Sequence, residues 1–220
     1  MAALRYLYQT LEFEDLDIHI RSLRDANQFS DDLGEAEGLG ISSAQWSLFG
    51  VLWSSSEVLA HEMAEYEIEG KRVLEVGCGV GLSSVLLNAR GADITATDYH
   101  PEAGNFLAVN SELNGGKKIP YLRADWADSA NGLGTFDLII GSDLLYEREH
   151  IDLLSAFINR HAKQNCEVVV VDPGRGNHAV FSKKMVTFGY KHSQYQPDCS
   201  AYLQKPFKGQ ILRYQRGESS

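Results

Sequence analysis

The sequence of 220 residues predicts an α/β fold, a Rossmann-like, doubly wound sheet of seven strands that is mostly parallel. Three observations predict it. Strand-like and helix-like segments alternate from residue 71 onward. The runs DLII (137–140) and VVVV (168–171) are continuously apolar, as is typical of central strands covered on both faces. No helix-like segment separates the last two strand-like segments, 190–195 and 210–216, so we expect an antiparallel C-terminal hairpin.

The N-terminal part has a different pattern. Residues 4–13 and 16–25 alternate apolar and polar side chains, which predicts a β-hairpin. The acidic, glycine-containing segment 26–40 is typical of a loop. We therefore expect a small N-terminal β extension with its loop, residues 1–45, followed by one domain, residues 46–220.

The expected elements of the main domain follow from their periodicity and turn residues. The predicted strands are 71–77, 92–98, 119–125, 136–143, 166–173, 190–195 and 210–216. The predicted helices are 54–67, 81–90, 101–114, 148–162 and a segment near 177–189. A Ser-x-x-Glu capping pattern from Ser54 to Glu57 and a proline at 101 favour the starts of two of these helices.

Composition narrows the classes of partner. The net charge of −10 disfavours binding to a nucleic-acid backbone, which requires clustered Lys and Arg. The acidity suits a basic protein surface, or it only keeps the protein soluble. Cys78, Cys166 and Cys199 form no Cys-x-x-Cys pair, which favours a reducing compartment. No segment resembles a signal peptide or a membrane span, so we expect a cytoplasmic protein that binds no membrane and is monomeric.

A glycine-rich turn, GCGVG at 77–81, follows the first strand of the alternating region. Glycines let the backbone approach a ligand closely, and open α/β sheets bind ligands beyond the carboxyl ends of their strands. A dinucleotide, a phosphate and a sulfonium cofactor are all candidates. A dinucleotide site requires Gly-x-Gly-x-x-Gly, whereas here the third glycine comes one place early. The Lys-Ser or Lys-Thr of a phosphate-binding loop does not follow the turn.

Two carboxylates accompany the turn. Asp98 ends the next strand, where a carboxylate can accept both ribose hydroxyls of an adenosine-containing cofactor. Glu75 precedes the first glycine by two residues; its charge would repel a pyrophosphate but suits an amino group and a sulfonium. A glycine-rich turn without any ligand is the alternative. The stretch VLEVGCGVGLSSVLL (73–87) resembles the first motif of class I, seven-stranded S-adenosylmethionine-dependent methyltransferases, and the resemblance extends over about residues 50–214.

Further stretches are similar to the methyltransferase family 16 group, many members of which methylate protein lysines. Trp53, in GVLWSSSEVLAHEM, matches a tryptophan that lines the cofactor site in that family, although the family often has proline where this chain has Ser54. In RADWAD, Asp125 and Trp126 match a pair that frames the adenine in the family. Ordinary core packing is the alternative for both tryptophans.

The stretch FDLIIGSDLLYE carries Asp143 and Tyr146, an Asp-x-x-Tyr pattern that follows the fourth strand in the lysine methyltransferases it resembles. A lysine amine must be neutral to attack a methyl group, and its ordinary pKa is about 10.4. A partly dry channel lowers that pKa, and Asp143 would align the amine and help to remove its proton. Helix capping by Asp143 and core packing by Tyr146 are the alternatives. DPGR (172–175), similar to a stretch in bacterial members and in relatives that methylate electron-transfer flavoprotein, borders the substrate entrance or forms only a tight turn.

The sequence therefore predicts an enzyme that transfers a methyl group from S-adenosylmethionine to a lysine ε-amine of a protein substrate, leaving S-adenosylhomocysteine. A small-amine N-methyltransferase on the same fold and a non-catalytic cofactor-binding protein are the alternatives. The predicted catalytic residues are Asp143 and Tyr146, and no metal is expected. The predicted cofactor-binding residues are Trp53, Glu75, Gly77, Cys78, Gly79, Gly81, Asp98, Tyr99, Asp125, Trp126 and Ser142.

Overall fold

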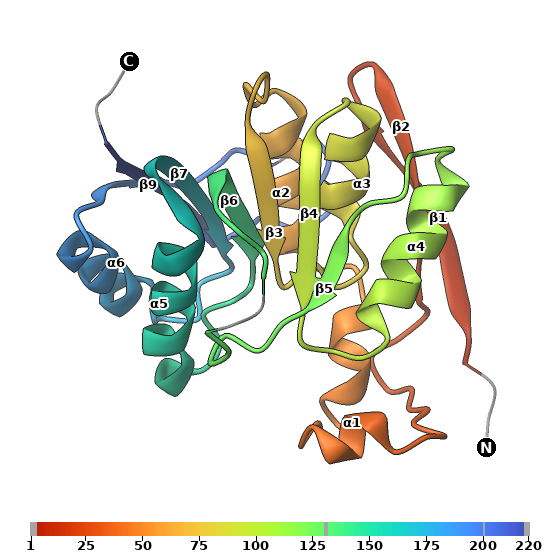
Figure 1. The fold of residues 1–220 in the computed structure, drawn as a ribbon. Coiled ribbons are helices and arrows are strands. Elements are labelled where there is room, and N and C mark those ends of the chain that lie inside the picture. The colour runs from red at the N-terminus through yellow and green to blue at the C-terminus, as the bar shows by residue number, and fades with distance from the viewer. Residues whose placement is uncertain (1–3, 130–131, 200, 218–220) are drawn as a thin grey trace.

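The computed structural model describes residues 4–129, 132–199 and 201–217. Its centre is a seven-stranded sheet in the order β5-β4-β3-β6-β7-β9-β8, with helices packed on both faces (Figure 1). The parallel strands are β3 (Arg72–Val76), β4 (Asp93–Asp98), β5 (Tyr121–Arg123), β6 (Phe136–Ser142) and β7 (Ala162–Asp172). The antiparallel strands are β8 (Lys191–Tyr195) and β9 (Gln210–Arg216). The predicted fold class and the antiparallel C-terminal pair are confirmed.

The sheet separates two apolar cores, because successive side chains of a strand point to opposite faces. The main helices are α2 (Ser54–Ala64), α3 (Leu82–Ala89), α4 (Ala103–Leu113), α5 (Ile151–His161) and α6 (His178–Thr187). In β3, Val73 packs in the core that contains residues of α2, α3 and α4, whereas its neighbour Leu74 packs in the core with residues of α5 and α6. Because both faces of the central strands are covered, their sequences are apolar without alternation.

The strand order reverses at β3. This strand pairs in parallel with β4 on one side and with β6 on the other. The chain therefore builds the sheet outward through β4 and β5, and then returns to build it in the opposite direction through β6 and β7. In open α/β sheets, ligands bind at the carboxyl ends of the strands next to such a reversal.

The N-terminal hairpin forms as predicted, from β1 (Tyr6–Phe13) and β2 (Leu16–Leu23). Side-chain amides fasten it to α4. The backbone N–H of Arg21 donates to Oδ1 of Asn110 at 2.8 Å, and the N–H of His19 donates to Oδ1 of Asn114, also at 2.8 Å. The hairpin thus covers one side of α4, as Figure 1 also shows.

The segment 26–40, which we expected to be a loop throughout, contains the short helix α1 (Glu35–Gly38). The carboxylate of Asp31 accepts hydrogen bonds from the backbone N–H groups of Ala36 and Glu37, at 3.1 and 2.9 Å. These bonds satisfy N–H groups that a helix start would otherwise leave without partners. A 3₁₀ turn, η1 (Trp46–Gly50), follows before α2.

The starts of α2 and of the helix predicted from residue 148 differ from expectation. Helix α2 begins at Ser54, but Trp53 is its N-cap and no side-chain capping bond forms, so the predicted capping pattern from Ser54 to Glu57 is wrong. Because Ser54 is already inside the helix, its hydroxyl does not stand at the cap position. The segment predicted as one helix from residue 148 begins with a 3₁₀ turn, η2 (Arg148–His150), and becomes α-helical afterwards.

Two other boundaries are also shifted. Helix α4 begins at Ala103, so Pro101 lies in the preceding turn instead of the first helical turn. Strand β7 begins at Ala162 and not at Cys166, because Ala162 pairs with Phe136 beyond an irregularity in the β6–β7 ladder. The start of β7 depends on this contact with a neighbouring strand, which the local pattern does not contain.

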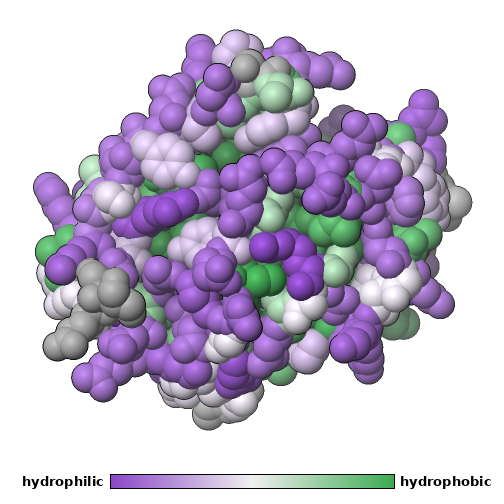
Figure 2. Space-filling view, turned by 90° about the horizontal axis from the view of Figure 1, so that it is seen from above, coloured by the Kyte–Doolittle hydropathy of each residue, from purple (hydrophilic) through white to green (hydrophobic). Residues whose placement is uncertain are grey.

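The surface seen from above in Figure 2 is covered mainly by hydrophilic residues, and its hydrophobic residues form small separate patches. Among the helices of the described residues, none has the length and apolar character that a membrane span requires. Cys78, Cys166 and Cys199 are each buried and unpaired.

Candidate active site

The turn after β3 is shaped by glycine. Gly77 has φ of 65° and Gly79 has φ of 53°, a region that side chains other than glycine rarely adopt. A Cβ atom on Gly79 would lie 2.7 Å from the carbonyl oxygen of Phe49, and one on Gly77 would lie 2.5 Å from Cδ2 of Leu144. The turn is therefore pressed between η1 and the segment after β6, and only glycine fits these two positions.

Asp98 lies at the end of β4, directly beside this turn. Its Oδ2 accepts a hydrogen bond from the backbone N–H of Gly79, and its Oδ1 accepts one from the N–H of His100, both at 2.8 Å. Burial raises the pKa of this carboxyl, and the backbone donors oppose that effect. A carboxylate has about four acceptor positions, so each oxygen can still accept a further donor. The parallel pairing of β3 with β4 brings the predicted turn and the predicted acid together.

Glu75 lies below the turn and faces inward. Its side chain is only 2% exposed, and its Oε2 accepts hydrogen bonds from the backbone N–H of Ser84, at 2.9 Å, and from the Ser84 hydroxyl. Burial raises the pKa of Glu75 to about 7, and the nearby charge of Asp98 adds to this. The contact that the structure shows for Glu75 is thus with the first turn of α3. Cys78 is also buried, and its backbone N–H donates to the carbonyl of Thr97.

Two aromatic residues of the predicted set contact the segment before α2, Trp53 from within it and Tyr99 from this edge of the sheet. Trp53 is 36% exposed, and its indole N–H donates to the carbonyl of Leu48 at 2.9 Å. Tyr99 follows Asp98 directly, and its hydroxyl donates to the carbonyl of Leu39 at 2.9 Å. Both rings are partly accessible to solvent, so each leaves a surface that a ligand can contact.

His100 is a residue that we did not predict in this region. It is 5% exposed and stacks on Phe49, with ring centroids 3.8 Å apart and an interplanar angle of 13°. Its Nδ1 accepts a hydrogen bond from the N–H of Glu102, and burial lowers the pKa of His100 to about 4. The imidazole ring is therefore neutral, and it packs the turn after β4 against η1. The only signal in the sequence was its position two residues after Asp98.

Asp125 and Trp126 follow β5, on the far side of β4. The backbone N–H of Ala124 donates to the carbonyl of Asp98 at 3.0 Å, which keeps the two strand ends together. Asp125 is exposed, and its Oδ1 accepts a hydrogen bond from the N–H of Ala127 at 2.8 Å. Trp126 is half-buried. The exposed Asp125 and the partly exposed Trp126 thus lie at the same edge as Asp98.

The predicted catalytic pair lies across the reversal point, after β6. Ser142 ends that strand, and Asp143 follows with φ of 54°, a strained value for a residue other than glycine. The backbone N–H of Asp143 donates to the carbonyl of Val171 at 2.9 Å. Tyr146 is 54% exposed and packs edge-on near His150. Asp143 does not cap a helix, and Tyr146 is not part of the core.

The carboxylate of Asp143 carries an unexpected partner. Arg175, which is not among the predicted catalytic residues, donates to both of its oxygens, at 2.9 and 2.7 Å. Neighbouring Asp172 is 1% exposed and accepts the backbone N–H of Gly174 at 3.2 Å. The DPGR stretch (172–175) changes the direction of the chain after β7 and places Arg175 beside Asp143. Their separation of 32 residues in sequence gave no local signal for this pair.

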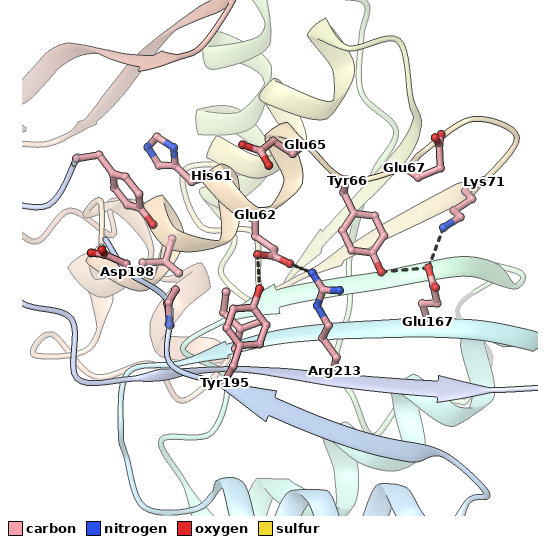
Figure 3. A pocket seen from close by; sticks show the side chains of 14 residues that line it. His61, Glu62, Glu65, Tyr66, Glu67, Lys71, Glu167, Tyr195, Asp198 and Arg213 are labelled. Atoms are coloured by element: carbon pink, nitrogen blue, oxygen red, sulfur yellow. Dashed lines mark hydrogen bonds and ion pairs between the residues drawn. The ribbon is translucent and has the colours of Figure 1, made fainter. Parts of the chain in front are cut away.

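A separate cavity of about 650 Å³ lies between α2 and the strands β7, β8 and β9 (Figure 3). In it, Glu62 accepts a hydrogen bond from the Tyr195 hydroxyl at 2.7 Å and pairs with Arg213. Glu167 pairs with Lys71 at 2.8 Å. These pairs join α2 to β8 and β9, and the residue before β3 to β7. The residues predicted for catalysis and cofactor binding do not line this cavity.

A comparison with solved structures places the fold in a known class. Magnesium protoporphyrin IX methyltransferase (ChlM) from Synechocystis PCC 6803, solved with bound SAH, matches with a TM-score of 0.57 at 19% identity. The match covers 74% of this chain and 82% of that one. The fold is that of the class I S-adenosylmethionine-dependent methyltransferases.

Within this class, the chain belongs to the lysine methyltransferase family, which it matches over residues 36–186. Protein N-lysine methyltransferase METTL21A of Danio rerio is 33% identical over 118 residues, which cover 49% of this chain and 54% of that protein. The electron transfer flavoprotein beta subunit lysine methyltransferase of Xenopus laevis is 28% identical over 134 residues, covering 59% and 52%. The chain therefore spans about half the length of these curated relatives.

Proposed function

We propose that this protein transfers a methyl group from S-adenosylmethionine to the ε-amine of a lysine in another protein. The observation that carries the proposal is the arrangement at the strand reversal. The glycine turn and Asp98 lie on the β3–β4 side, and Asp143 and Tyr146 lie on the β6 side. Membership of the lysine methyltransferase family and the names of the relatives support the same reaction.

The residues on the β3, β4 and β5 side suit the cofactor. Asp98, beside the Gly79 turn, would accept the ribose hydroxyls at its remaining acceptor positions. Asp125 would accept the exocyclic amine of adenine, and Trp126 would pack on its ring. The other residues assigned to this pocket are Trp53, Gly77, Cys78, Gly81, Tyr99 and Ser142, with Glu75 supporting the turn from below.

The β6 side suits the acceptor amine. S-adenosylmethionine, when bound, supplies a methyl group that its sulfonium charge has already activated. Asp143 holds the amine by a hydrogen bond and directs its lone pair toward the methyl carbon. Tyr146 forms a wall that keeps water away and favours the neutral amine. Positioning of this kind accounts for most of the acceleration.

The experiment is a labelling reaction. The purified protein and tritium-labelled S-adenosylmethionine are added to an extract of cells in which the gene for this chain is deleted. We expect a labelled band that resists nuclease and is destroyed by protease, with a methylated lysine located by mass spectrometry. Label only in the small-molecule fraction would instead support a small-amine methyltransferase. Cofactor binding without any transfer would support a non-catalytic protein.

We also propose the charge of the substrate surface, the cellular compartment, the oligomeric state and the domain division. The net charge of −10 supports a protein substrate that presents a basic surface, and not a nucleic acid. Three unpaired, buried cysteines support a reducing compartment such as the cytoplasm. We propose a monomer in which residues 1–45 form an extension fastened to the methyltransferase domain, residues 46–220.

A further inference from the structure

The carboxylate that we assign to the substrate amine already holds a cation. Arg175, in the loop between β7 and α6, donates from Nε to Oδ1 of Asp143 at 2.9 Å and from Nη2 to Oδ2 at 2.7 Å. This fork matches the planar guanidinium to both oxygens of the carboxylate. A lysine ammonium that approaches Asp143 therefore meets two oxygens that are already engaged.

The two partners differ in their freedom to move. Asp143 is held by its main-chain bond to Val171 and by its left-handed backbone conformation, and its side chain is only 15% exposed. Arg175 stands between Gly174 and Gly176, which have φ of 100° and 85°, and its side chain is 45% exposed. Arg175 is thus the partner that can withdraw into water while Asp143 stays in place.

Arg175 also keeps its charge throughout. The hydrogen bonds to Asp143 raise the pKa of Arg175 above its already high ordinary value, and the charge of Asp172 adds to this. Arginine is in any case not deprotonated in proteins. The competitor for Asp143 is therefore a cation at every pH at which the protein is folded, whereas a lysine amine must lose its proton before it can react.

We propose that Arg175 is a selectivity residue, whose guanidinium occupies Asp143 in the place of the substrate ammonium until a protein-bound lysine displaces it. This inference rests on the proposed function. A free amine interacts with the site only through its own charge. A lysine of a protein substrate also gains binding energy from contacts between the surrounding protein surface and the enzyme. A pair that is closed for about nine-tenths of the time weakens a competing amine about tenfold. The same factor applies to every amine, so the pair excludes small amines, which bind weakly, whereas a protein lysine whose surroundings add binding energy still reaches Asp143.

The first experiment uses the protein as its own substrate. If Arg175 marks the position of the substrate ammonium, Arg175→Lys places a reactive amine there. We expect this variant, incubated with S-adenosylmethionine, to gain a methyl group at position 175, located by mass spectrometry of its peptides. The wild type and the double variant Arg175→Lys/Asp143→Asn are expected to gain none at that position.

The second experiment measures competition with n-butylamine, a mimic of the lysine side chain. We expect Arg175→Ala to methylate n-butylamine with a kcat/KM about tenfold above that of the wild type, through a lower KM at unchanged kcat. The matched control is Arg5→Ala, which removes an arginine from an exposed ion pair with Asp25. We expect it to behave as the wild type.

The outcomes separate the two proposals. A lower kcat of Arg175→Ala at unchanged KM would overturn the inference, since Arg175 would then position Asp143 for transfer. An unmethylated position 175 in Arg175→Lys, while the wild type labels a protein band in the extract, would also overturn it. If no variant transfers a methyl group to n-butylamine or to any extract protein, the proposed function fails, and the inference fails with it.

Discussion

The carboxylate of Asp98 accepts a hydrogen bond from the backbone N–H of Gly79 at 2.8 Å and so joins the end of β4 to the turn after β3. A second bond, from the N–H of His100, holds the other oxygen. One side chain therefore fixes the turn and presents a carboxylate beside it.

Asp98→Ala is expected to weaken the binding of S-adenosylhomocysteine by about ten- to a hundredfold. Hydrogen bonds to charged groups contribute about 1.5–3 kcal/mol, and the substitution removes those to the ribose and loosens the turn. Isothermal titration calorimetry measures the affinity. The control is Asp93→Ala, at the exposed start of the same strand, where Asp93 pairs with Arg72 at 3.4 Å. Equal affinities of the two variants would remove Asp98 from the cofactor site.

Asp143→Ala is expected to reduce methyl transfer by about 10²- to 10⁴-fold, because the amine loses the group that orients it and assists its deprotonation. Its affinity for S-adenosylhomocysteine should stay close to that of the wild type. Transfer of the radioactive methyl group and calorimetry measure the two quantities separately. Asp152→Ala, which changes an exposed residue of α5 paired with Lys184, serves as the control. Full turnover by the Asp143 variant would contradict its assigned role.

Glu75 makes stability depend on pH, because burial raises the pKa of its carboxyl from its ordinary value of 4.5 to about 7. Between these values the unfolded chain loses the proton first, so the free energy of unfolding falls as pH rises, by about 3 kcal/mol in total. Glu75→Gln removes this titration. We expect its free energy of unfolding, measured with urea at pH 5 and pH 8, to change less than that of the wild type.

The control for this measurement is Glu69→Gln, since Glu69 is an exposed carboxylate just before β3. It should keep the pH dependence of the wild type. If the Glu75 and Glu69 variants respond to pH in the same way, the buried carboxyl does not titrate as described.

His100 has the opposite effect on stability: it makes the free energy of unfolding fall as the pH falls. Burial lowers the pKa of its imidazole from 6.5 to about 4, and the charge of Asp31 opposes this only in part. As pH falls from about 6.5 to 4, the unfolded chain takes up a proton that the folded chain refuses. This lowers the free energy of unfolding by about 3 kcal/mol. His100→Asn, which keeps an acceptor for the N–H of Glu102, should lose less stability on acidification.

Urea denaturation at pH 6.5 and pH 4.5 measures this effect. The exposed residue His19 provides the matched control, His19→Asn. The same acid sensitivity in the His100 variant and in the wild type would show that another group is responsible.

Local patterns were sufficient for the framework of the site. Hydrophobic runs and turn residues predicted the strands, the antiparallel end of the sheet and the glycine turn, because these depend on neighbours along the chain. Asp98 could be singled out because it ends the strand after the glycine turn, and Asp143 because the Asp-x-x-Tyr pattern after the fourth strand resembles that of lysine methyltransferases. Element boundaries were less certain, as at Ala162, where a partner strand decides the first residue.

The sequence by itself determined the fold class, the order of the strands along the chain, and the residue types at the carboxyl ends of those strands. Only the tertiary structure decided which side chains pair: Glu75 with Ser84, His100 with Phe49, and Asp143 with Arg175. The physical reason is the distance along the chain over which each feature is determined. Backbone periodicity is set by residues a few positions apart, whereas a side-chain pair depends on the packing that brings distant segments to within 3 to 4 Å of each other.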